Sequence, residues 1–357
     1  MANTQPGPAP QSVERSLTSP DRYARQSLFA GIGLEGQQRI DRARVLIVGC
    51  GALGTSLASY LVRAGTGYVR IVDRDFVEGN NLQRQVLFAE DDVRRRMPKA
   101  IAAANYLRTV NSQVTVDPIV ADVTADGIMN LLEDVDLVLD GTDNFEIRYV
   151  LNDACIKNGT PWIYSGVIAS YGVTMTVVPH DTACLRCVFP ERPLPGTTPT
   201  CDTAGVLNSI VGIVAGLAAT EAFKLMTRSD RIVRGLTWVD VWENTFDRIE
   251  LPRQTECPAC GRGEFAFLDA PVDSSGTTLC GRDAVQVHAP PGHAGLIDLA
   301  QLGERLQAVG TVRSNPYLLQ LAVDNFDITL FADGRAIIKG TADPAVARML
   351  YARYIGS

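Results

Sequence analysis

The sequence contains few histidines and lacks an unbroken apolar stretch long enough to cross a membrane. Its three histidines are His180, His288 and His293, and none of them has an obvious nucleophile beside it. This scarcity argues against a hydrolase that pairs a histidine with a catalytic serine or cysteine. Because no segment approaches roughly 18 consecutive apolar residues, we expect no membrane partner.

Basic residues are fewer than acidic residues. The chain has 33 Lys and Arg residues against 40 Asp and Glu residues, a formal net charge of −7. An acidic chain is a poor partner for nucleic acid or an anionic surface. Residues 1–20 are rich in proline and lack the apolar core of a signal peptide, so they predict a disordered leader and a cytoplasmic protein. In that compartment the eight cysteines are expected to be thiols or metal ligands.

The most informative motif is the GxGxxG turn formed by Gly49, Gly51 and Gly54. It follows the apolar run 45–48 and precedes an apolar segment, 57–64, that reads as a helix. Glycines in a strand–turn–helix let the backbone approach a phosphate, and the helix N-terminus supplies free N–H groups. A second strand, 69–72, ends in Asp73, which is placed to hold a ribose hydroxyl. The motif predicts an adenine nucleotide without separating NAD, FAD and ATP.

The strand–helix alternation continues and predicts an α/β fold. A third clear strand is expected over 135–140, and Asp143 and Asn144 follow it, where open parallel sheets bind ligands. Two further strands over 162–178, a long loop over 185–204, an apolar helix over 206–226 and two strands over 234–251 come next. We therefore expect a Rossmann-like domain whose mixed, largely parallel sheet continues into an antiparallel part.

A small α+β domain is expected at the C-terminus. The full division is a leader (1–20), a nucleotide-binding domain with a metal site (21–268), a linker (269–278) and a C-terminal domain (279–357). Strands over 284–288, 317–323, 326–331 and 336–339 and helices over 296–309 and from Pro344 make up the last part. Asp324-Asn325 and Asp333-Gly334 suit hairpin turns, and Asp343 suits a helix N-cap. This domain holds no cluster of catalytic residue types.

Four cysteines occur as two CxxC pairs. Cys184 and Cys187 form one pair, and Cys257 and Cys260 form the other. Each pair can reach one metal ion, and together they complete a tetrahedral zinc site with four thiolate ligands. Because no ligand position is left open, we expect the Zn²⁺ to be structural.

Charged residues downstream of the turn fit a triphosphate. Arg84 and Lys99 could neutralise phosphate oxygens, although solvated surface positions are the ordinary fate of such residues. Asp143 could coordinate Mg²⁺ at the phosphates or could simply be a helix N-cap.

Cys201 lies in the long loop, just before the apolar helix. A thiol near a helix N-terminus has a lowered pKa, which suits a nucleophile. From position alone, a loop cysteine of no consequence is an equally good interpretation.

Several motifs occur in one order along residues 21–262. They are RYARQ at 22–26, ARVLIVGCGALG at 43–54, NLQRQ at 81–85, GTDNFEIRY at 141–149 and CLRCVFPE at 184–191. This set resembles the MoeB/ThiF family of adenylyltransferases, bacterial relatives of the ubiquitin-activating enzymes, and within it a longer ThiF-type protein.

The resemblance implies a reaction and its partners. Members use ATP and Mg²⁺ to adenylate the C-terminal Gly-Gly carboxylate of a ubiquitin-like sulfur carrier protein, ThiS or MoaD, which releases pyrophosphate. A sulfur donor, such as a cysteine desulfurase or a sulfurtransferase, then supplies the sulfur of a thiocarboxylate. The family resemblance also implies a homodimer.

The resemblance also implies residue roles. Asp73 would hold the ribose, Asn81 would line the nucleotide site, and Arg84 and Lys99 would neutralise the phosphates. Asp143 would coordinate Mg²⁺. Two further residues would act elsewhere: Arg25 would reach into the site of the dimer partner, and Cys201 matches a cysteine that becomes linked to the carrier in some members.

The chain departs from the family pattern in two places. Ala52 stands where members usually have glycine, a change that the flanking glycines should tolerate. The domain at 279–357 is absent from the shortest members and lacks a cysteine-rich loop, so it does not read as a rhodanese. We expect it to dock the carrier or to extend the dimer.

Two other functions remain open at this point. An NAD-dependent oxidoreductase would explain the glycine turn and Asp73, but not Arg84 and Lys99. A non-catalytic scaffold held by zinc would explain the cysteine pairs, but not the phosphate-binding residues.

Overall fold

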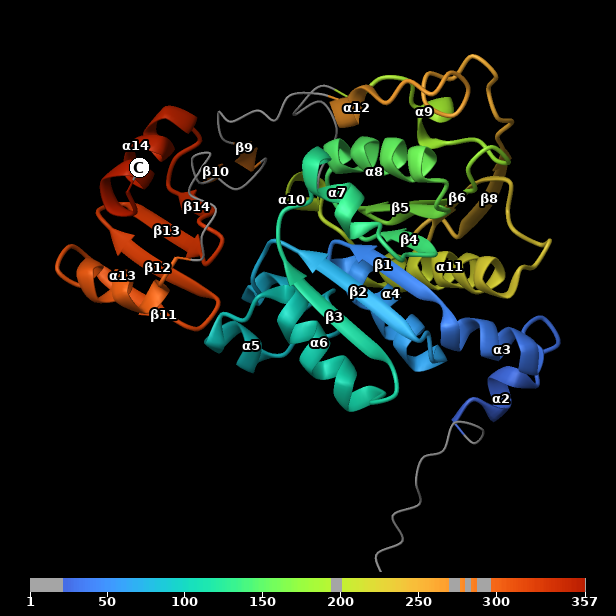
Figure 1. The fold of residues 1–357 in the computed structure, drawn as a ribbon, viewed down its shortest axis with the longest axis horizontal. Helices are drawn as coiled ribbons and strands as arrows, with labels where there is room; N and C mark the ends of the chain where they lie inside the picture. Colours follow the sequence, from blue (N-terminus) through green and yellow to red (C-terminus); the bar gives the residue numbers. More distant parts are fainter. Residues whose placement is uncertain (1–21, 194–200, 270–276, 280–283, 288–296, 357) are drawn as a thin grey trace, which may run out of the picture.

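Two β-sheets organise the chain in a computed structural model that describes residues 22–193, 201–269, 277–279, 284–287 and 297–356. Within these ranges, one sheet has eight strands in the order β3-β2-β1-β4-β5-β6-β7-β8, and the other has six in the order β11-β12-β13-β14-β10-β9 (Figure 1). The predicted leader lies outside the described residues.

The larger sheet is parallel in one half and antiparallel in the other. β1, β2, β3, β4 and β5 run parallel, whereas β6, β7 and β8 continue the sheet antiparallel from β5. This arrangement confirms the predicted fold class. The strands are β1 (Arg44–Val48), β2 (Tyr68–Asp73), β3 (Thr115–Val120), β4 (Leu137–Asp140), β5 (Trp162–Ile168), β6 (Tyr171–Val177), β7 (Gly235–Asp240) and β8 (Thr245–Glu250).

Helices cover both faces of this sheet. Successive residues of a strand point to opposite faces, so Val45 and Ile47 join one apolar cluster while Leu46 and Val48 join the other. The first cluster contains α4, α6 and α11, and the second contains α7, α8 and α9. Their bounds are α4 (Ala52–Ala64), α6 (Lys99–Val110), α11 (Asn208–Thr227), α7 (Ala125–Leu131), α8 (Phe145–Asn158) and α9 (Leu185–Val188).

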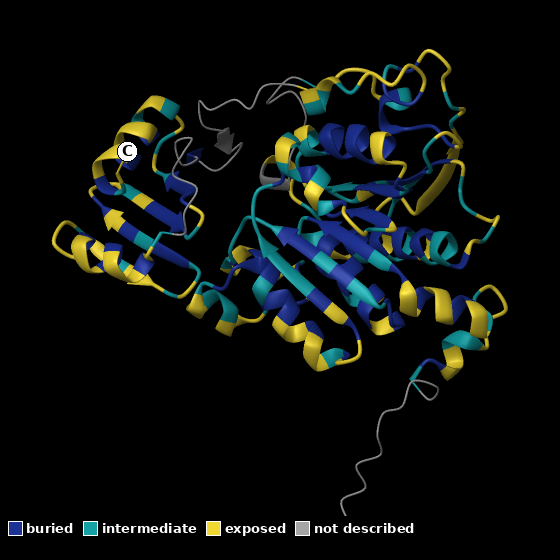
Figure 2. Cartoon of the chain, in the orientation of Figure 1, coloured by how far each residue is buried: buried dark blue, intermediate teal, exposed yellow. Residues whose placement is uncertain are grey.

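Shorter helices lie around the sheet. They are α2 (Ala24–Ser27), α3 (Gly33–Arg42), the 3-10 helix η1 (Gly79–Asn81), α5 (Glu90–Arg95), α10 (Cys201–Ala204) and α12 (Ala266–Asp269). Figure 2 shows dark buried strands in the middle of the large sheet, whereas its last strand, β8, is exposed along its whole length.

The apolar helix α11 contradicts the expectation that no segment is long and apolar enough to cross a membrane. α11 has the length and composition of a membrane span, with a mean hydropathy of 1.5, so the statement that no segment approaches this length was wrong. Its Ile210, Val214 and Ala218 are fully buried in the cluster that also contains α4. A helix that is apolar because it packs inside a domain passes the same test.

Other elements differ from the sequence predictions in their bounds. β3 was not predicted, and the expected loop at 185–204 contains both α9 and α10. α4 begins at Ala52, five residues earlier than expected, because Gly51 is its N-cap. Residues 194–200 of the long loop lie outside the described residues.

The C-terminal sheet is a meander covered by two helices. Its strands are β9 (Thr277–Leu279), β10 (Ala284–Val287), β11 (Thr311–Ser314), β12 (Leu318–Val323), β13 (Phe326–Phe331) and β14 (Ala336–Lys339), with α13 (Leu299–Leu306) and α14 (Pro344–Tyr354). Asp343 accepts from the N–H of Ala345, so the predicted N-cap is confirmed. β11 was missed, and β9 begins inside the predicted linker, of which residues 270–276 lie outside the described residues.

Candidate nucleotide and metal sites

The glycine turn joins β1 to α4 at the carboxyl edge of the large sheet. Gly49 has φ of +88°, a left-handed conformation that favours glycine. A Cβ atom on Gly54 would lie 1.9 Å from the carbonyl oxygen of Gly49, so a side chain there would push the helix off the strand. Gly51 caps α4, and the first N–H groups of the helix lack intrahelical acceptors, which suits a phosphate group.

Asp73 connects the end of β2 to this turn. Its carboxylate accepts from the N–H of Cys50 at 2.6 Å and from the N–H of Asp75 at 2.7 Å. Burial raises the pKa of Asp73, and the nearby charge of Lys99 acts in the opposite direction. The predicted ribose ligand therefore lies against the glycine turn and close to the predicted phosphate ligand.

Lys99 begins α6 and points back toward β2. Its side chain is 6% exposed, and its Nζ lies 3.2 Å from Oδ2 of Asp75. The N–H of Lys99 also donates to the carbonyl oxygen of Asp75 at 2.9 Å. Asp75 was missed by sequence reasoning, although the alternation Asp73-Arg74-Asp75 at a strand end was a usable signal.

The loop after β4 completes the same edge. A Cβ atom on Gly141 would lie 2.5 Å from the carbonyl oxygen of Gly49, so this loop packs directly on the glycine turn. The exposed Asp143 follows. Burial lowers the pKa of Arg74, but the charges of Asp122, Asp75 and, to a smaller extent, Asp143 outweigh burial and raise it. The alternative role of Asp143 as a helix N-cap is wrong, because Asn144 caps α8 by accepting from the N–H of Glu146.

A buried ion pair holds that loop in place. Arg148 donates from Nε to Asp140 at 2.9 Å and from Nη2 to the carbonyl oxygens of Thr142 and Ser165. Asp140 in turn accepts from the N–H and hydroxyl groups of Thr142. Burial raises the pKa of Asp140, against the influence of the Arg148 charge. Arg148 was not foreseen as part of the site.

Arg84 and Asn81 lie on the segment around η1. Asn81 is 2% exposed and accepts from the N–H of Glu78 at 3.1 Å. Arg84 is half-buried and donates to the carbonyl oxygen of Asn80 at 2.8 Å. The described part of the chain thus brings together the turn, Asp73, Lys99 and the Asp143 loop, with Arg84 on an adjoining segment.

The four predicted zinc ligands form one cluster. Their sulfur atoms all lie within 4.8 Å of one another, and the Sγ–Sγ distances are 3.9 Å (Cys184–Cys187), 3.5 Å (Cys184–Cys257) and 3.4 Å (Cys187–Cys260). Tetrahedral zinc with bonds of about 2.3 Å separates its sulfur ligands by about 3.8 Å. The residues present therefore fit the metal, with four protein ligands and no open position.

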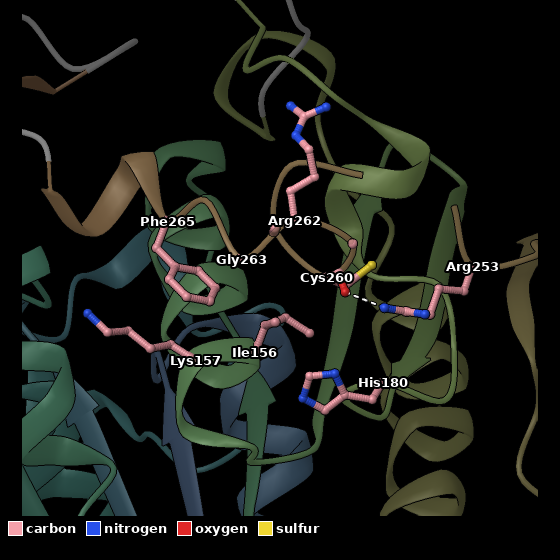
Figure 3. Close-up of a pocket in the computed structure, with 10 residues that line it drawn as sticks. Ile156, Lys157, His180, Arg253, Cys260, Arg262, Gly263 and Phe265 are labelled. Carbon is pink, nitrogen blue, oxygen red and sulfur yellow. Dashed lines mark hydrogen bonds between the residues drawn. The ribbon is translucent and has the colours of Figure 1, made fainter. Parts of the chain in front are cut away.

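A pocket of about 350 Å³ lies beside this cluster, apart from the glycine turn. Lys157, His180, Arg253 and Arg262 are among the residues that line it. Figure 3 shows Lys157 and Arg262 directing their charged ends outward, while Arg253 donates to the carbonyl oxygen of Cys260. Because these positive charges do not point toward one place, the pocket does not form an anion-binding site.

Arg25 lies at the opposite edge of the sheet from the glycine turn. It is exposed on α2, beside Tyr23, whose hydroxyl accepts from Asn111 at 2.7 Å. Asn111 follows the last residue of α6, and Lys99 is the first, so the length of α6, about 18 Å for 12 residues, separates them. Figure 1 shows α2 and α3 at the end of the molecule away from the C-terminal sheet.

Cys201 is the first residue of the four-residue α10. Its side chain lies outside the described residues. The carbonyl oxygen of Gly205 accepts from the N–H of Ala169 at 2.9 Å. This hydrogen bond fixes the end of the long loop, which we call the crossover segment (185–204), beside β5 and β6.

Residues 23–259 match the profile of the ThiF family. The chain is 44% identical over 340 residues to the sulfur carrier protein ThiS adenylyltransferase of Bacillus subtilis, covering 94% of this chain and 99% of that protein. It is 40% identical over 253 residues to the SAMP-activating enzyme E1 of Haloferax volcanii, covering 71% and 93%. An alignment of 340 residues must include most of the C-terminal sheet, which lies beyond the family profile.

The fold is also similar to a solved structure. The crystal structure of E. coli MccB superposes with a TM-score of 0.61 at 23% sequence identity, covering 68% of this chain and 73% of that one. At this level of identity the likeness concerns the fold alone.

Proposed function

The chain belongs to the ThiF family and is a nucleotidyltransferase, and we propose that it adenylates the C-terminal Gly-Gly carboxylate of a ubiquitin-like sulfur carrier of the ThiS or MoaD type. Its products would be a carrier acyl-adenylate and pyrophosphate, and sulfur from a donor protein would then form a thiocarboxylate. The observation that carries the proposal is the meeting of the glycine turn, Asp73, Lys99 and the Asp143 loop at one edge of the sheet.

The proposed chemistry is mainly a problem of charge. A carboxylate that attacks the α-phosphate of ATP meets an anion, so catalysis depends on cations placed around the transition state. We assign the ribose to Asp73, with Asn81 lining the site, and the phosphates to the N-terminus of α4, Lys99 and Arg84. Asp143 would hold Mg²⁺, which shields the phosphate charge when bound.

We assign Arg25 to the active site of a partner subunit. The length of α6 separates Arg25 from its own Lys99, so it reaches a nucleotide only across a homodimer interface. Large apolar side chains near it are unusually exposed: Leu28 is 83%, Phe29 66% and Leu34 75% exposed. Apolar groups gathered on a surface favour a protein–protein contact.

The four-cysteine cluster is assigned to structural Zn²⁺, held by Cys184, Cys187, Cys257 and Cys260. The metal would join the segment after β6 to the segment after β8. Such thiols persist in a reducing compartment, and we place the protein in the cytoplasm. Cys201, on the crossover segment, is the proposed point of covalent linkage to the carrier.

We also assign separate roles to the two parts of the chain. Residues 21–268 would carry the adenylation chemistry and the zinc site, and residues 279–357 would form a second domain joined through 269–278. The main apolar cluster of the C-terminal sheet is separate from the two large clusters that cover the faces of the other sheet, which supports this division.

Carrier-dependent exchange of labelled pyrophosphate into ATP tests the function. ThiS-type and MoaD-type carriers are each supplied with ATP and Mg²⁺, and the matched control is the same carrier without its two terminal glycines. We expect exchange with the intact carrier of the correct type and none with the truncated one. Absence of exchange with every carrier, together with selective thermal stabilisation by NAD over ATP–Mg²⁺, would replace this function with that of an oxidoreductase.

A further inference from the structure

The C-terminal sheet packs against the same edge of the large sheet that carries the candidate nucleotide site. Phe76, three residues after β2, and Val120, the last residue of β3, pack on the buried cluster of Ala284, Leu318, Phe331 and Ile337. Tyr317 packs near Val77 and Met97. Figure 1 shows the C-terminal sheet on the side of the molecule where α5 lies. The contact is therefore apolar at its centre.

Polar contacts surround this apolar centre. Lys339 Nζ lies 2.6 Å from Oε1 of Glu78, and Gln286 Nε2 donates to Asp122 at 2.5 Å. The side-chain amide of Asn315 donates to two backbone carbonyl oxygens, those of Arg95 at 3.0 Å and Arg96 at 3.1 Å. These contacts join segments that are far apart in the sequence, with Gln286 and Asp122 separated by 164 positions.

Glu78 lies in a backbone segment that pairs with a second segment, and Arg95 and Arg96 directly precede that second segment. The N–H of Val77 donates to the carbonyl oxygen of Met97, and the N–H of Lys99 donates to that of Asp75, both at 2.9 Å. Between them, Phe76 and Pro98 form an isolated antiparallel β-bridge. We call residues 75–78 and 97–99 the nucleotide-edge ladder. Asp73 precedes one of its segments by two residues, and Lys99 ends the other. The position of the ladder therefore sets where the predicted ribose and phosphate ligands lie.

A buried cation adds an electrostatic link between the two sheets. Arg335 is 3% exposed, its guanidinium lies 3.8 Å from the centre of the Phe331 ring, and its side-chain nitrogen atoms have no hydrogen-bond acceptor among the described residues. Burial lowers the pKa of Arg335, and the charges of Asp333, Asp122 and Asp75 act in the opposite direction. The nearest of these carboxylates is Asp333 of the same sheet, whose Oδ2 lies 3.5 Å from Arg335 Nε, whereas Asp75, which pairs with Lys99, has a smaller influence.

We propose that the C-terminal domain is a positioning element of the nucleotide site, which holds the nucleotide-edge ladder in the geometry that binds ATP. Asn315 and Lys339 are its positioning residues. By linkage, ATP binding and docking of this domain stabilise each other. The proposal rests on the proposed adenylation, and it replaces the expectation that this domain chiefly docks the carrier or extends the dimer.

The replacement Asn315→Asp tests this with almost no change of shape. The carboxylate can still accept from the N–H groups of Tyr317 and Leu318, which keeps the local turn. It loses both hydrogen bonds to the carbonyl oxygens of Arg95 and Arg96, which directly precede the ladder segment 97–99, and places negative charge against these oxygens. Asn325→Asp is the matched control, because Asn325 is exposed in the β12–β13 turn of the same sheet. Lys339→Met removes the second contact and keeps the length of the side chain.

We expect Asn315→Asp to raise the KM for ATP about tenfold, equivalent to about 1.4 kcal/mol, with kcat nearly unchanged. Lys339→Met should act in the same direction, and Asn325→Asp should match the wild type. Hydrogen exchange without nucleotide should show less protection of the Val77 and Lys99 amides in Asn315→Asp than in Asn325→Asp. An altered KM for the carrier with an unchanged KM for ATP would overturn the proposal in favour of carrier docking.

The hydrogen-exchange measurement separates this proposal from the proposed function. If no carrier supports exchange in the wild type, adenylation fails, yet the protection of the ladder amides still reports on positioning. Equal protection in the wild type, Asn315→Asp and Asn325→Asp would overturn the positioning role whether or not adenylation is observed.

Discussion

Lys99 shows how a single side chain can serve both the fold and the chemistry. It lies almost buried between Asp75, at 3.2 Å, and the charge of Asp73. A phosphate group entering the site would add a third anion around the same ammonium group. In the proposed role, the two carboxylates would hold the lysine at the start of α6, where its ammonium group would face the phosphates.

Replacing Lys99 with Met should remove most of the adenylation activity. The side chain keeps its length and loses its charge, so transition-state stabilisation falls by about 2–4 kcal/mol, or about 30- to 1,000-fold in rate. Pyrophosphate exchange measures the loss, and circular dichroism checks that the fold persists. Lys157→Met is the matched control, since Lys157 is exposed beside the zinc cluster. Activity of Lys99→Met close to that of Lys157→Met would remove Lys99 from the site.

At this scale, the sequence predicts residues whose role follows from local geometry. Gly49 and Gly54 were identified because a strand–turn–helix leaves no room for a side chain at those positions. Asp75 and Arg148 were missed, because their importance comes from pairing with Lys99 and Asp140 inside the folded chain. Burial and pairing of charges depend on contacts that no local pattern encodes.

At the scale of elements, β2 and β3 are joined by a polar cluster on one face. Asp117 on β3 accepts from Tyr68 at 2.5 Å and from Arg70 at 3.0 Å, both on β2. Burial alone would raise the pKa of Asp117, but the two hydrogen bonds outweigh it and the pKa is lowered. The folded state therefore binds the Asp117 proton more weakly than the unfolded chain does.

Asp117→Asn should destabilise the protein at neutral pH, and the difference should vanish in acid. A lowered folded-state pKa contributes stability above the unfolded value of about 3.9 and loses it as the pH falls further. Because the Asp117 side chain is 36% exposed, we expect about 1 kcal/mol or less. Urea unfolding from about pH 7 to about pH 3 measures it, with the exposed Asp230→Asn as control. A difference that grows toward acid would contradict the assigned sign.

β3 is an example of a strand that residue preferences do not predict. It contains Asp117 and Pro118 in the middle of a short strand, and both residue types are depleted in strands. The structure resolves the conflict because β3 is the edge of the sheet, where proline is tolerated. The central β1, which is buried and rich in Val, Leu and Ile, was predictable from the same rules.

At the scale of the whole molecule, the four-cysteine cluster joins segments 73 residues apart. Cys187→Ser or a strong chelator should remove about one zinc per chain and lower Tm by roughly 5–10 °C, at 2–4 °C per kcal/mol lost. Cys155→Ala is the control, since Cys155 is fully buried and is not one of the clustered ligands. Calorimetry and metal analysis measure both effects. Full zinc content in Cys187→Ser would show that the cluster is not the metal site.

The docking of the C-terminal sheet also belongs to this scale, and the sequence could not predict it. Four of its strands, its hairpin turns and its final helix follow from local patterns, but the residues that meet the large sheet do not form a motif. Lys339 and Glu78 are 261 positions apart, and each reads alone as an ordinary surface charge. Only the folded chain places them together.

A mixing experiment tests the proposed dimer and the position of Arg25 together. Arg25→Ala and Lys99→Met should each be nearly inactive when alone. In a mixed dimer, the site on the Arg25→Ala subunit keeps its own Lys99 and receives Arg25 from the Lys99→Met subunit, so it is complete. Random reassociation makes about half of the dimers mixed, with one complete site of two, so activity should return to about a quarter of the wild type. Pyrophosphate exchange after co-refolding measures the recovery, with each variant refolded alone as control. If Arg25 acted within its own subunit, every site would still lack one of the two residues, and mixing would restore nothing.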